Sequence, residues 1–431
     1  MRRKHHPYYY RWKGKLLRSG IRIISHLRLL LRWMIRAVCM GVIVGIIGVG
    51  FVYAIQFVTA IRLAHPWVLL SLPLGGLLIV WLYRVTHDQN DGGTNMVLAS
   101  LRAETELPVQ MAPLIFLSTI LTHLCGGSAG REGAALQLGG SIGSLWSRIF
   151  HLHTRDKRVM ILCGMSAAFS AIFRTPVAAP IFAMEVVCVG AMHYAALVPC
   201  TVSSLTASWL AEKLGLPRAS YDVLDVPELA VVPALKILLL GIFCAVVSIL
   251  FCMLLHGTEK LFVQKLKNPY LRILAASGIL WILLLLLRNQ DYIGLGTAEI
   301  VQSIGGKTVW YAFLAKMLFT AVTLAGGFKG GEIVPSFFVG ASFGCLFGEI
   351  AGLSPSFCAA VGMTALFCGV TNCPVASLLI ATELFGFAGA PYYLLAIAVS
   401  YLLSGYYGLY KEQTFLSSKF SGGMVNHKTR E

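Results

Sequence analysis

Apolar runs alternate with short polar, glycine-rich or proline-containing breaks along almost the whole chain. Ala37–Ile61, Trp67–Val85 and Leu229–Phe262 are long enough to cross a bilayer as helices, which takes about 20 residues. The other apolar segments are Met111–Cys125, Val159–Phe173, Val177–Gly190, Tyr194–Leu214, Leu271–Leu287, Val309–Leu324, Ser336–Ile350, Phe357–Val370, Val375–Ala388 and Tyr392–Tyr410. Many of these are too short to span, and such segments are tolerated at membrane depth only where protein or a cavity covers the backbone. The pattern predicts an all-α polytopic membrane protein with many short or broken helices.

The broken segments recur in the two halves of the chain. TPVAAPIFAMEVV at 175–187 resembles CPVASLLIATELF at 373–385, at an offset of 198 residues. GREGAALQLGG at 130–140 resembles GGEIVPSFFVG at 330–340, at an offset of 200 that pairs the glutamates of the two segments. Short segments at matching positions of two halves are typical of a site near the bilayer midplane. We therefore predict a duplicated unit of about two hundred residues whose copies meet at the functional site.

Composition supports a membrane protein and excludes a soluble one. The 431 residues are 57% hydrophobic and only 13% charged, whereas soluble domains carry about 25% charged residues. The formal net charge is +16, and eleven Lys and Arg occur through Arg36, before the first acidic residue, Asp88. Such a segment is typical of the cytoplasmic face and can also contact membrane lipid. No nucleic-acid-binding motif accompanies it, so we do not expect nucleic acid as a partner.

These patterns divide the chain into a basic cytoplasmic or interfacial segment, a first membrane repeat, a linker loop, a second membrane repeat and a polar tail. The expected bounds are 1–36, 37–216, 217–228, 229–410 and 411–431, in that order. We expect no large soluble domain. The basic stretch is too long for a signal peptide, and the first apolar run is of spanning length. The expected location is the cell membrane, with the N-terminus in the cytoplasm.

The candidate chemistry is concentrated in the glycine-rich stretch GGSAGREGAALQLGGSIG at 126–143. Its Arg131 and Glu132 are charges within an otherwise apolar region, where each costs about 2.5–3.5 kcal/mol and is retained mainly along a pathway or cavity. The following residues can form a helix, which places both at its first turn. Unpaired amide groups and the positive end of the dipole make that turn an anion site. Glycines let the backbone approach a ligand closely.

The remaining motifs give weaker indications of function. The eleven Cys form no CxxC pair and have no His at metal spacing, so we expect neither a metal nor a cofactor. The sequence around Ser128 matches the hydrolase pattern GxSxG, which requires a strand–turn–helix context that the flanking apolar segments do not offer. An intramembrane serine hydrolase that uses Ser128 is kept only as a remote alternative.

The glycine-rich stretch and the two proline-containing segments resemble the CLC family of anion channels and anion/proton antiporters, over about residues 37–410. The family block GREGP corresponds to GREGA at 130–134. The family's proline-containing helix with a following glutamate occurs twice, ending at Glu185 and Glu383. The resemblance implies the CLC fold with two inverted-topology repeats and a homodimer with one pathway per subunit. It also implies that Glu132 is the gating residue that transfers protons.

Two blocks resemble the fluoride/proton antiporter branch of that family. The usual GSGIP is replaced by DGGTNM at 91–96, so the chloride-binding serine is missing, and a second block reads GGFKGGEIVP at 326–335. The family's second, inner glutamate for proton transfer would align near Val186, so this chain lacks it. The branch often carries Thr where this chain has Val334. The resemblance implies an anion-binding set of Gly93, Asn95, Arg131, Gly133, Ile333, Val334 and Tyr410.

The function that this resemblance implies is export of fluoride in exchange for protons. Fluoride is small and strongly hydrated, so its dehydration requires strong donors such as the amide of Asn95 and helix-terminal N–H groups. The ionised carboxylate of Glu132 would occupy the anion site, and the protonated form would leave it. A chloride/proton antiporter or a voltage-gated-type chloride channel of the same fold remains open. So do the roles of Glu185, Glu332 and Glu383.

Overall fold

The computed structural model describes residues 7–86, 92–102, 106–421 and 423–430, and the described part contains sixteen α-helices. Asp91, the first residue of the DGGTNM block, lies outside these residues. The first half consists of α1 (Pro7–Ala64), η1 (Pro66–Ser71), α2 (Leu72–Val85), α3 (Thr94–Leu101), α4 (Met111–Cys125), α5 (Glu132–Ile149), α6 (Thr154–Phe173), α7 (Ala178–Glu185), β1 (Cys188–Val189), η2 (Tyr194–Ala196) and α8 (Leu197–Lys213). The second half consists of α9 (Val231–Lys265), α10 (Pro269–Leu287), α11 (Thr297–Ile304), α12 (Ala312–Gly326), α13 (Ile333–Ala351), α14 (Pro355–Thr371), α15 (Pro374–Phe385), α16 (Ala390–Leu403), β2 (Thr414–Ser417) and β3 (Met424–Lys428).

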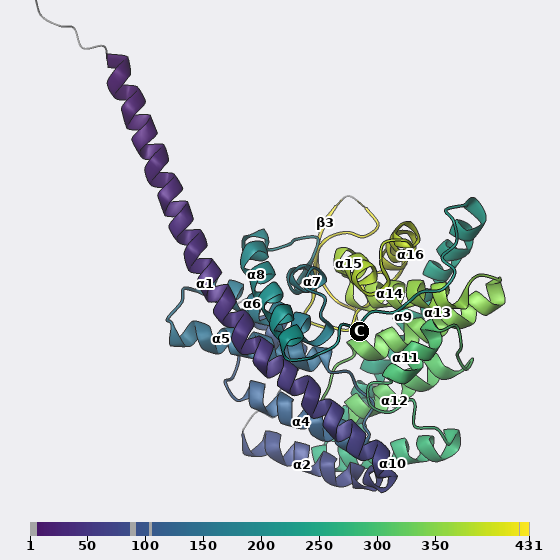
Figure 1. Ribbon diagram of the computed structural model, residues 1–431. Helices are drawn as coiled ribbons and strands as arrows, with labels where there is room; N and C mark the ends of the chain where they lie inside the picture. The colour runs from purple at the N-terminus through teal and green to yellow at the C-terminus, as the bar shows by residue number, and fades with distance from the viewer. Residues whose placement is uncertain (1–6, 87–91, 103–105, 422, 431) are drawn as a thin grey trace, which may run out of the picture.

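Long and short helices are mixed as the apolar pattern predicts. Within the described residues, six helical stretches are long and apolar enough to cross a membrane, while α4, α12, α14, α15 and α16 are apolar but shorter. The predicted all-α polytopic fold is confirmed. The helix α1 runs without a break through residue 36, where the sequence suggested a boundary. Figure 1 shows its N-terminal part projecting beyond the other helices.

Glycine contacts hold together the helix pair α5–α6 and, at the same place in the second half, the pair α13–α14. A Cβ on Gly139 would lie 2.2 Å from the Gly164 carbonyl oxygen, and a Cβ on Gly340 would lie 2.6 Å from the Gly362 carbonyl oxygen. Both crossings therefore require glycine so that the two backbones can approach closely. The repeated pair fixes where the N-termini of α5 and α13 point.

The structure corrects the predicted pairing of Glu132 with Glu332, which is wrong by one residue. Helix α5 begins at Glu132 and α13 begins at Ile333, so these two residues are equivalent. Arg131 and Glu332 occupy the preceding N-cap position with similar backbone angles, φ −108° and φ −99°. The sequence match aligned the two glutamates, whereas the helix crossings fix the register through the glycines. The second copy therefore contributes an acid one residue before the position of Glu132.

Glu185 and Glu383 exchange contacts across the two halves. The Glu185 carboxylate accepts hydrogen bonds from the N–H groups of Val375 (3.1 Å) and Ala376 (2.8 Å), at the start of α15. Glu383 accepts from the N–H groups of residues 177 and 178 at the start of α7, at the same two distances. This reciprocal pattern is what a two-fold relation between inverted repeats produces. Each glutamate satisfies N–H groups that have no partner within their own helix, which gives both a structural role.

Truncation of Glu185 to Ala is expected to destabilise the protein by about 2–3 kcal/mol, because hydrogen bonds to a charged group contribute about 1.5–3 kcal/mol and the buried N–H groups would be left unpaired. Thermal unfolding of the detergent-solubilised protein measures this. The control is Glu349→Ala, an exposed glutamate near the end of α13. Equal melting temperatures for the two variants would contradict the capping role.

The C-terminal tail folds into a small sheet rather than remaining an unattached polar segment. Strand β2 pairs in parallel with β1 and antiparallel with β3, in the order β1-β2-β3. The buried side chain of Lys419 lies in the connection between β2 and β3. Its Nζ donates to the Asn372 side-chain oxygen, at the end of α14, and to the Tyr401 carbonyl of α16. The tail is therefore fastened to helix ends of the second half.

Candidate functional site

The segments just before the N-termini of α5 and α13 meet in the protein interior through an antiparallel bridge between two buried glycines. The Gly130 N–H donates to the Gly331 carbonyl at 2.6 Å, and the Gly331 N–H donates to the Gly130 carbonyl at 2.7 Å. A Cβ on Gly331 would lie only 2.4 Å from the Gly133 nitrogen. The bridge therefore depends on glycine, and it brings two positive helix ends together.

Glu132 lies at this junction as the first residue of α5, and its side chain is completely buried. Its carboxylate turns back toward the helix N-terminus, where it accepts a hydrogen bond from the Arg131 N–H at 2.9 Å. The Arg131 Nε contacts the other carboxylate oxygen at 3.3 Å. The carboxylate thus occupies the kind of position that an anion would take at a helix N-terminus. An anion arriving there would compete with it.

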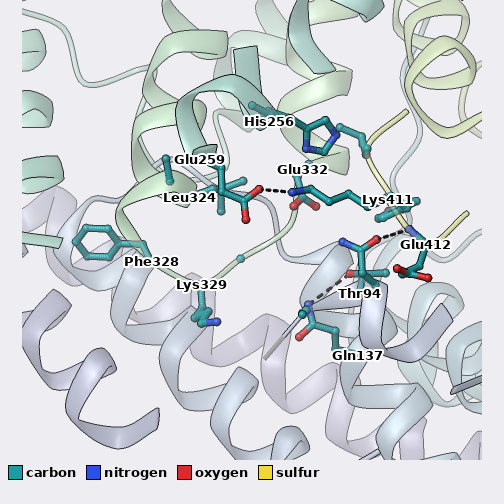
Figure 2. A pocket seen from close by; sticks show the side chains of 18 of the residues that line it. Thr94, Gln137, His256, Glu259, Leu324, Phe328, Lys329, Glu332, Lys411 and Glu412 are labelled. Atoms are coloured by element: carbon teal, nitrogen blue, oxygen red, sulfur yellow. Dashed lines mark hydrogen bonds and ion pairs between the residues drawn. The ribbon is translucent and has the colours of Figure 1, made fainter. Parts of the chain in front are cut away.

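A cavity of about 300 Å³ lies on one side of this junction (Figure 2). Its walls come from the start of α3, from α4, α5, α9 and the end of α12, and from the two segments that precede α13 and β2. The lining residues are Gly92, Gly93, Thr94, Asn95, Ile115, Gln137, Leu255, His256, Glu259, Leu324, Ala325, Phe328, Lys329, Gly330, Glu332, Leu409, Tyr410, Lys411 and Glu412. The site is therefore assembled from both repeats and the beginning of the tail.

Two hydrogen-bond donors in this cavity have no acceptor among the described residues. The Tyr410 hydroxyl is buried and makes no hydrogen bond with any described residue. The side-chain oxygen of Asn95 accepts the Glu412 N–H at 3.1 Å, which leaves the Asn95 NH₂ group as the available donor. The Tyr410 hydroxyl is fully buried, where a donor without an acceptor is costly, whereas Asn95 is only partly buried. The pair is therefore suited to an anion.

Gln137 joins the same wall from α5, five residues after Glu132. Its Nε2 donates to the Thr94 hydroxyl at 3.4 Å, and Thr94 donates to the Gly133 carbonyl at 3.3 Å. Figure 2 shows the Gln137 amide beside Thr94. Gly93 has φ +61°, and a Cβ there would lie 3.3 Å from the Gln137 Nε2. The loop before α3 can therefore pass close to α5 only because this residue is glycine.

The charged groups of the cavity are mostly paired. The Lys411 Nζ contacts Glu259 at 3.0 Å, and the Glu412 carboxylate contacts Arg102 and Lys428. Burial acts to raise the pKa of the Glu412 carboxyl, but hydrogen bonds from Lys428 and Arg102 outweigh it and hold that pKa below its usual value. Glu412 is therefore ionised at neutral pH.

The structure distributes the predicted site residues between the cavity and the helix junction. Gly93, Asn95 and Tyr410 line the cavity, and so does Glu332, whose role the sequence left open. The others lie at or next to the two helix N-termini, outside the cavity lining: Arg131, Glu132, Gly133, Ile333 and Val334. A Cβ on Gly133 would lie 3.5 Å from a Glu332 carboxylate oxygen. The two groups of residues therefore adjoin at Gly133.

Sequence reasoning missed several lining residues, namely Gln137, His256, Lys411 and Glu412. Gln137 could have been found, because an amide five residues after Glu132 on the same helix is unusual in an apolar segment. Lys411 and Glu412 carried no local signal, since they reach the site only when the tail folds back.

Ser128 does not have the surroundings of a hydrolytic nucleophile. Its hydroxyl donates to the Tyr292 carbonyl at 2.8 Å and contacts the Thr320 hydroxyl at 3.1 Å. In the described part of the chain no histidine or carboxylate is hydrogen-bonded to it. A serine nucleophile needs an adjacent general base, so the geometry gives Ser128 a structural role.

Known proteins share both the sequence and the fold. The chain is 31% identical over 395 residues to a "Chloride/fluoride channel protein" of Pseudomonas syringae pv. tomato, covering 90% of this chain and 87% of that protein. It is 32% identical to the crystal structure of a CLC-type fluoride/proton antiporter, with a TM-score of 0.86 and coverage of 90% and 98%. A slow cyanobacterial Cl⁻/H⁺ antiporter shares the fold at 19% identity, with a TM-score of 0.74 and coverage of 86% and 94%. The family model described as "Voltage gated chloride channel" matches residues 75–405, so the chain belongs to this CLC family of membrane transporters and channels.

Proposed function

We propose that this protein exports fluoride in exchange for protons, with Glu132 as the gate. The observation that carries the proposal is the position of the Glu132 carboxylate, fully buried at the N-terminus of α5 beside the bridge to α13. Membership of the CLC family already makes the chain a transporter or channel rather than an enzyme. The choice of fluoride is supported by relatives that are named for fluoride and are more than 30% identical.

The gate works by exchange between a tethered and a free anion. When ionised, the Glu132 carboxylate holds the Arg131 N–H and excludes other anions from the helix N-terminus. Protonation removes its charge, so the side chain leaves and an anion takes its place. Each round of protonation and deprotonation of the Glu132 carboxyl then couples the movement of a proton to the passage of an anion. Glu332 lines the cavity, and its carboxylate lies 3.5 Å from where a Cβ on Gly133 would be, so we assign it the proton step between the cavity and Glu132.

We assign the preference for fluoride over chloride to the two hydrogen-bond donors of the anion cavity, the Asn95 amide and the Tyr410 hydroxyl. Fluoride loses more hydration free energy than chloride on entering a dry site, so it requires short hydrogen bonds in exchange. The Asn95 NH₂ and the Tyr410 hydroxyl both face the cavity without a protein acceptor in the described residues. A pair of small, fixed donors suits a small anion better than a large polarisable one.

Purified protein in liposomes tests the proposal. Fluoride efflux should be accompanied by proton uptake, and an imposed proton gradient should drive fluoride against its own gradient. Chloride under the same conditions should move much more slowly. Fluoride movement with no proton movement, or chloride flux equal to that of fluoride, would contradict the proposal.

The second candidate is a chloride-conducting protein of the same fold, either an antiporter or a channel. Val334 favours it, because the position at the start of α13 carries an aliphatic, buried side chain where the fluoride branch often has a hydroxyl. The name of the Pseudomonas relative mentions chloride as well as fluoride. The liposome measurement separates the two candidates, since each predicts a different preferred anion.

Replacing Asn95 by Ala is expected to reduce the preference for fluoride over chloride by about tenfold or more, because a hydrogen bond to a charged partner contributes about 1.5–3 kcal/mol. The readout is the ratio of fluoride to chloride flux for the same preparation. The control, Asn289→Ala, removes an amide whose oxygen accepts the Asp291 N–H in a loop away from the cavity. An unchanged ratio for Asn95→Ala would remove this residue from selectivity.

Assembly and orientation complete the proposal. The CLC resemblance supports a homodimer, and the residues of the site all come from one chain, so each subunit would carry its own pathway. The basic N-terminal segment supports a cytoplasmic N-terminus in the cell membrane.

A further inference from the structure

We propose that a second cavity, between α3, α6, the α7–β1 segment and the C-terminal sheet, binds a phosphate ester with an apolar tail, and that its occupancy alters anion transport. This cavity has a volume of about 720 Å³, which is in the range of pockets for small organic ligands. It shares no lining residue with the anion cavity. The binding claim stands by itself, while the effect on transport rests on the proposed function.

Part of the lining of this second cavity is apolar. Leu101 of α3, Leu162 of α6, Met184 of α7 and Leu416 of β2 contribute to its walls. A bare inorganic ion would fill only a small part of this volume and would gain nothing from these side chains. Burial of an alkyl group there stabilises the complex in proportion to the apolar area removed from water. The occupant is therefore expected to be amphiphilic.

The lining of the second cavity also carries positive charge. Arg102, Arg158 and Lys428 line it, and Glu412 is the carboxylate that pairs with Arg102 and Lys428. Within the part of the chain that the structure describes, the Arg158 Nη2 contacts only the Arg102 carbonyl, at 3.5 Å, and its Nε is buried without a partner. Among the described residues, Arg158 has no carboxylate partner.

Phosphate is the anionic group that these side chains would bind best. The planar guanidinium of an arginine presents parallel donors that match phosphate oxygens, and such charge-assisted bonds are among the strongest in proteins. Arg158 offers this fork without first having to leave a carboxylate. A phosphate monoester at neutral pH carries nearly two negative charges, which would be placed beside the cations of Arg158, Arg102 and Lys428 in the cavity lining.

A direct chain of contacts links the second cavity to the anion cavity through Glu412. Its carboxylate holds Arg102 and Lys428, which line the second cavity. Its backbone N–H holds the side-chain oxygen of Asn95 in the anion cavity, at 3.1 Å. A phosphate that draws the two cations away from Glu412 would therefore disturb the orientation of the Asn95 amide. Figure 2 shows Glu412 at the edge of the anion cavity.

The second cavity is lined in part by α6, whose first turn contacts the end of the basic N-terminal segment. The Arg36 side chain of α1 contacts Asp156 in the first turn of α6 at 3.4 Å, and Arg158 follows two residues later. With a cytoplasmic N-terminus this end of α6 faces the inner leaflet, which carries anionic lipid. A lipid headgroup and a soluble phosphate ester share the same chemistry, so the experiment includes both.

The binding test uses the purified full-length protein and octyl phosphate as the probe, with isothermal titration calorimetry below the critical micelle concentration. We expect saturable binding that becomes at least about tenfold weaker in Arg158→Gln, because the unpaired arginine fork is lost. The control, Arg155→Gln, changes an exposed arginine of the same helix that does not line the cavity. Absence of saturable binding, or equal affinity in wild type and Arg158→Gln, would overturn the proposal. A second variant, Lys428→Gln on the exposed β3, should also weaken binding.

Two further probes separate the possible sources. Inorganic phosphate should bind at least about tenfold more weakly than octyl phosphate, since it lacks the apolar part; equal affinity would overturn the amphiphilic assignment. Phosphatidate in phosphatidylcholine liposomes should change the fluoride flux in an Arg158-dependent manner if a lipid is the ligand. If only octyl phosphate does so, the ligand is a soluble ester, and if neither does, the link to transport is overturned. Binding is measured without transport, so failure of this proposal and failure of fluoride export give different results.

Discussion

Replacing Glu132 by Gln is expected to reduce the proton uptake that accompanies fluoride efflux by more than tenfold, which corresponds to a loss of about 1.4 kcal/mol or more. Gln has the shape of the protonated side chain but cannot release a proton. It also cannot form the charged contacts that the carboxylate makes with Arg131 at 2.9 and 3.3 Å. The measurement is the pH change inside liposomes during fluoride efflux, with protein-free liposomes as background.

A buried glutamate elsewhere in the molecule provides the matched control. Glu299 in α11 is 5% exposed, accepts a hydrogen bond from the Thr308 hydroxyl at 2.9 Å and lies outside the lining of both cavities. Gln can accept the same hydrogen bond, so Glu299→Gln should leave proton uptake unchanged. If Glu132→Gln still exchanged protons for fluoride at the rate of the wild type, another group would carry the proton and the proposed gate would be wrong.

Substituting Ala for Gly164 is expected to lower the stability of the protein by about 1–3 kcal/mol or more through overpacking. A Cβ there would lie 2.0 Å from the Gly139 carbonyl oxygen of α5. Because that neighbour is backbone, the helices α5 and α6 must move apart. This displaces the N-terminus of α5 and with it Glu132, so we expect a lower melting temperature together with loss of transport.

The comparison for this substitution is Gly257→Ala in α9. A Cβ on Gly257 would meet no atom within 4 Å, and Ala favours a helix over Gly by about 0.5–1 kcal/mol. This variant should be as stable as the wild type or slightly more stable. A melting temperature for Gly164→Ala that matches that of Gly257→Ala would show that the α5–α6 crossing tolerates a side chain.

Much of the fold could be predicted from the chain because membrane depth restricts the solutions. Apolar runs of spanning and sub-spanning length, recurring in two halves, leave few arrangements in which all backbone groups are satisfied. Glu132 could be found for the same reason, as a charge that hydrocarbon does not tolerate without a function. The exact register between the two repeats could not be predicted from the sequence. Aligning Glu132 with Glu332 matched identical letters, whereas the crossings at Gly139 and Gly340 align Glu132 with Ile333.

From the residues alone it follows that this is an α-helical membrane protein of two related halves, with an acidic residue and glycines at a helix start. These properties depend on local composition and spacing, so each can be read from a single segment without knowledge of its contacts with other segments. The folded protein was needed to show that Glu185 and Glu383 each cap a helix of the other repeat and that Glu332 lines the cavity. It alone also placed Glu412 against Asn95. These contacts join residues that are far apart along the chain. Whether an N–H group or a cation has a partner can therefore be decided only once the positions of its neighbours in the fold are known.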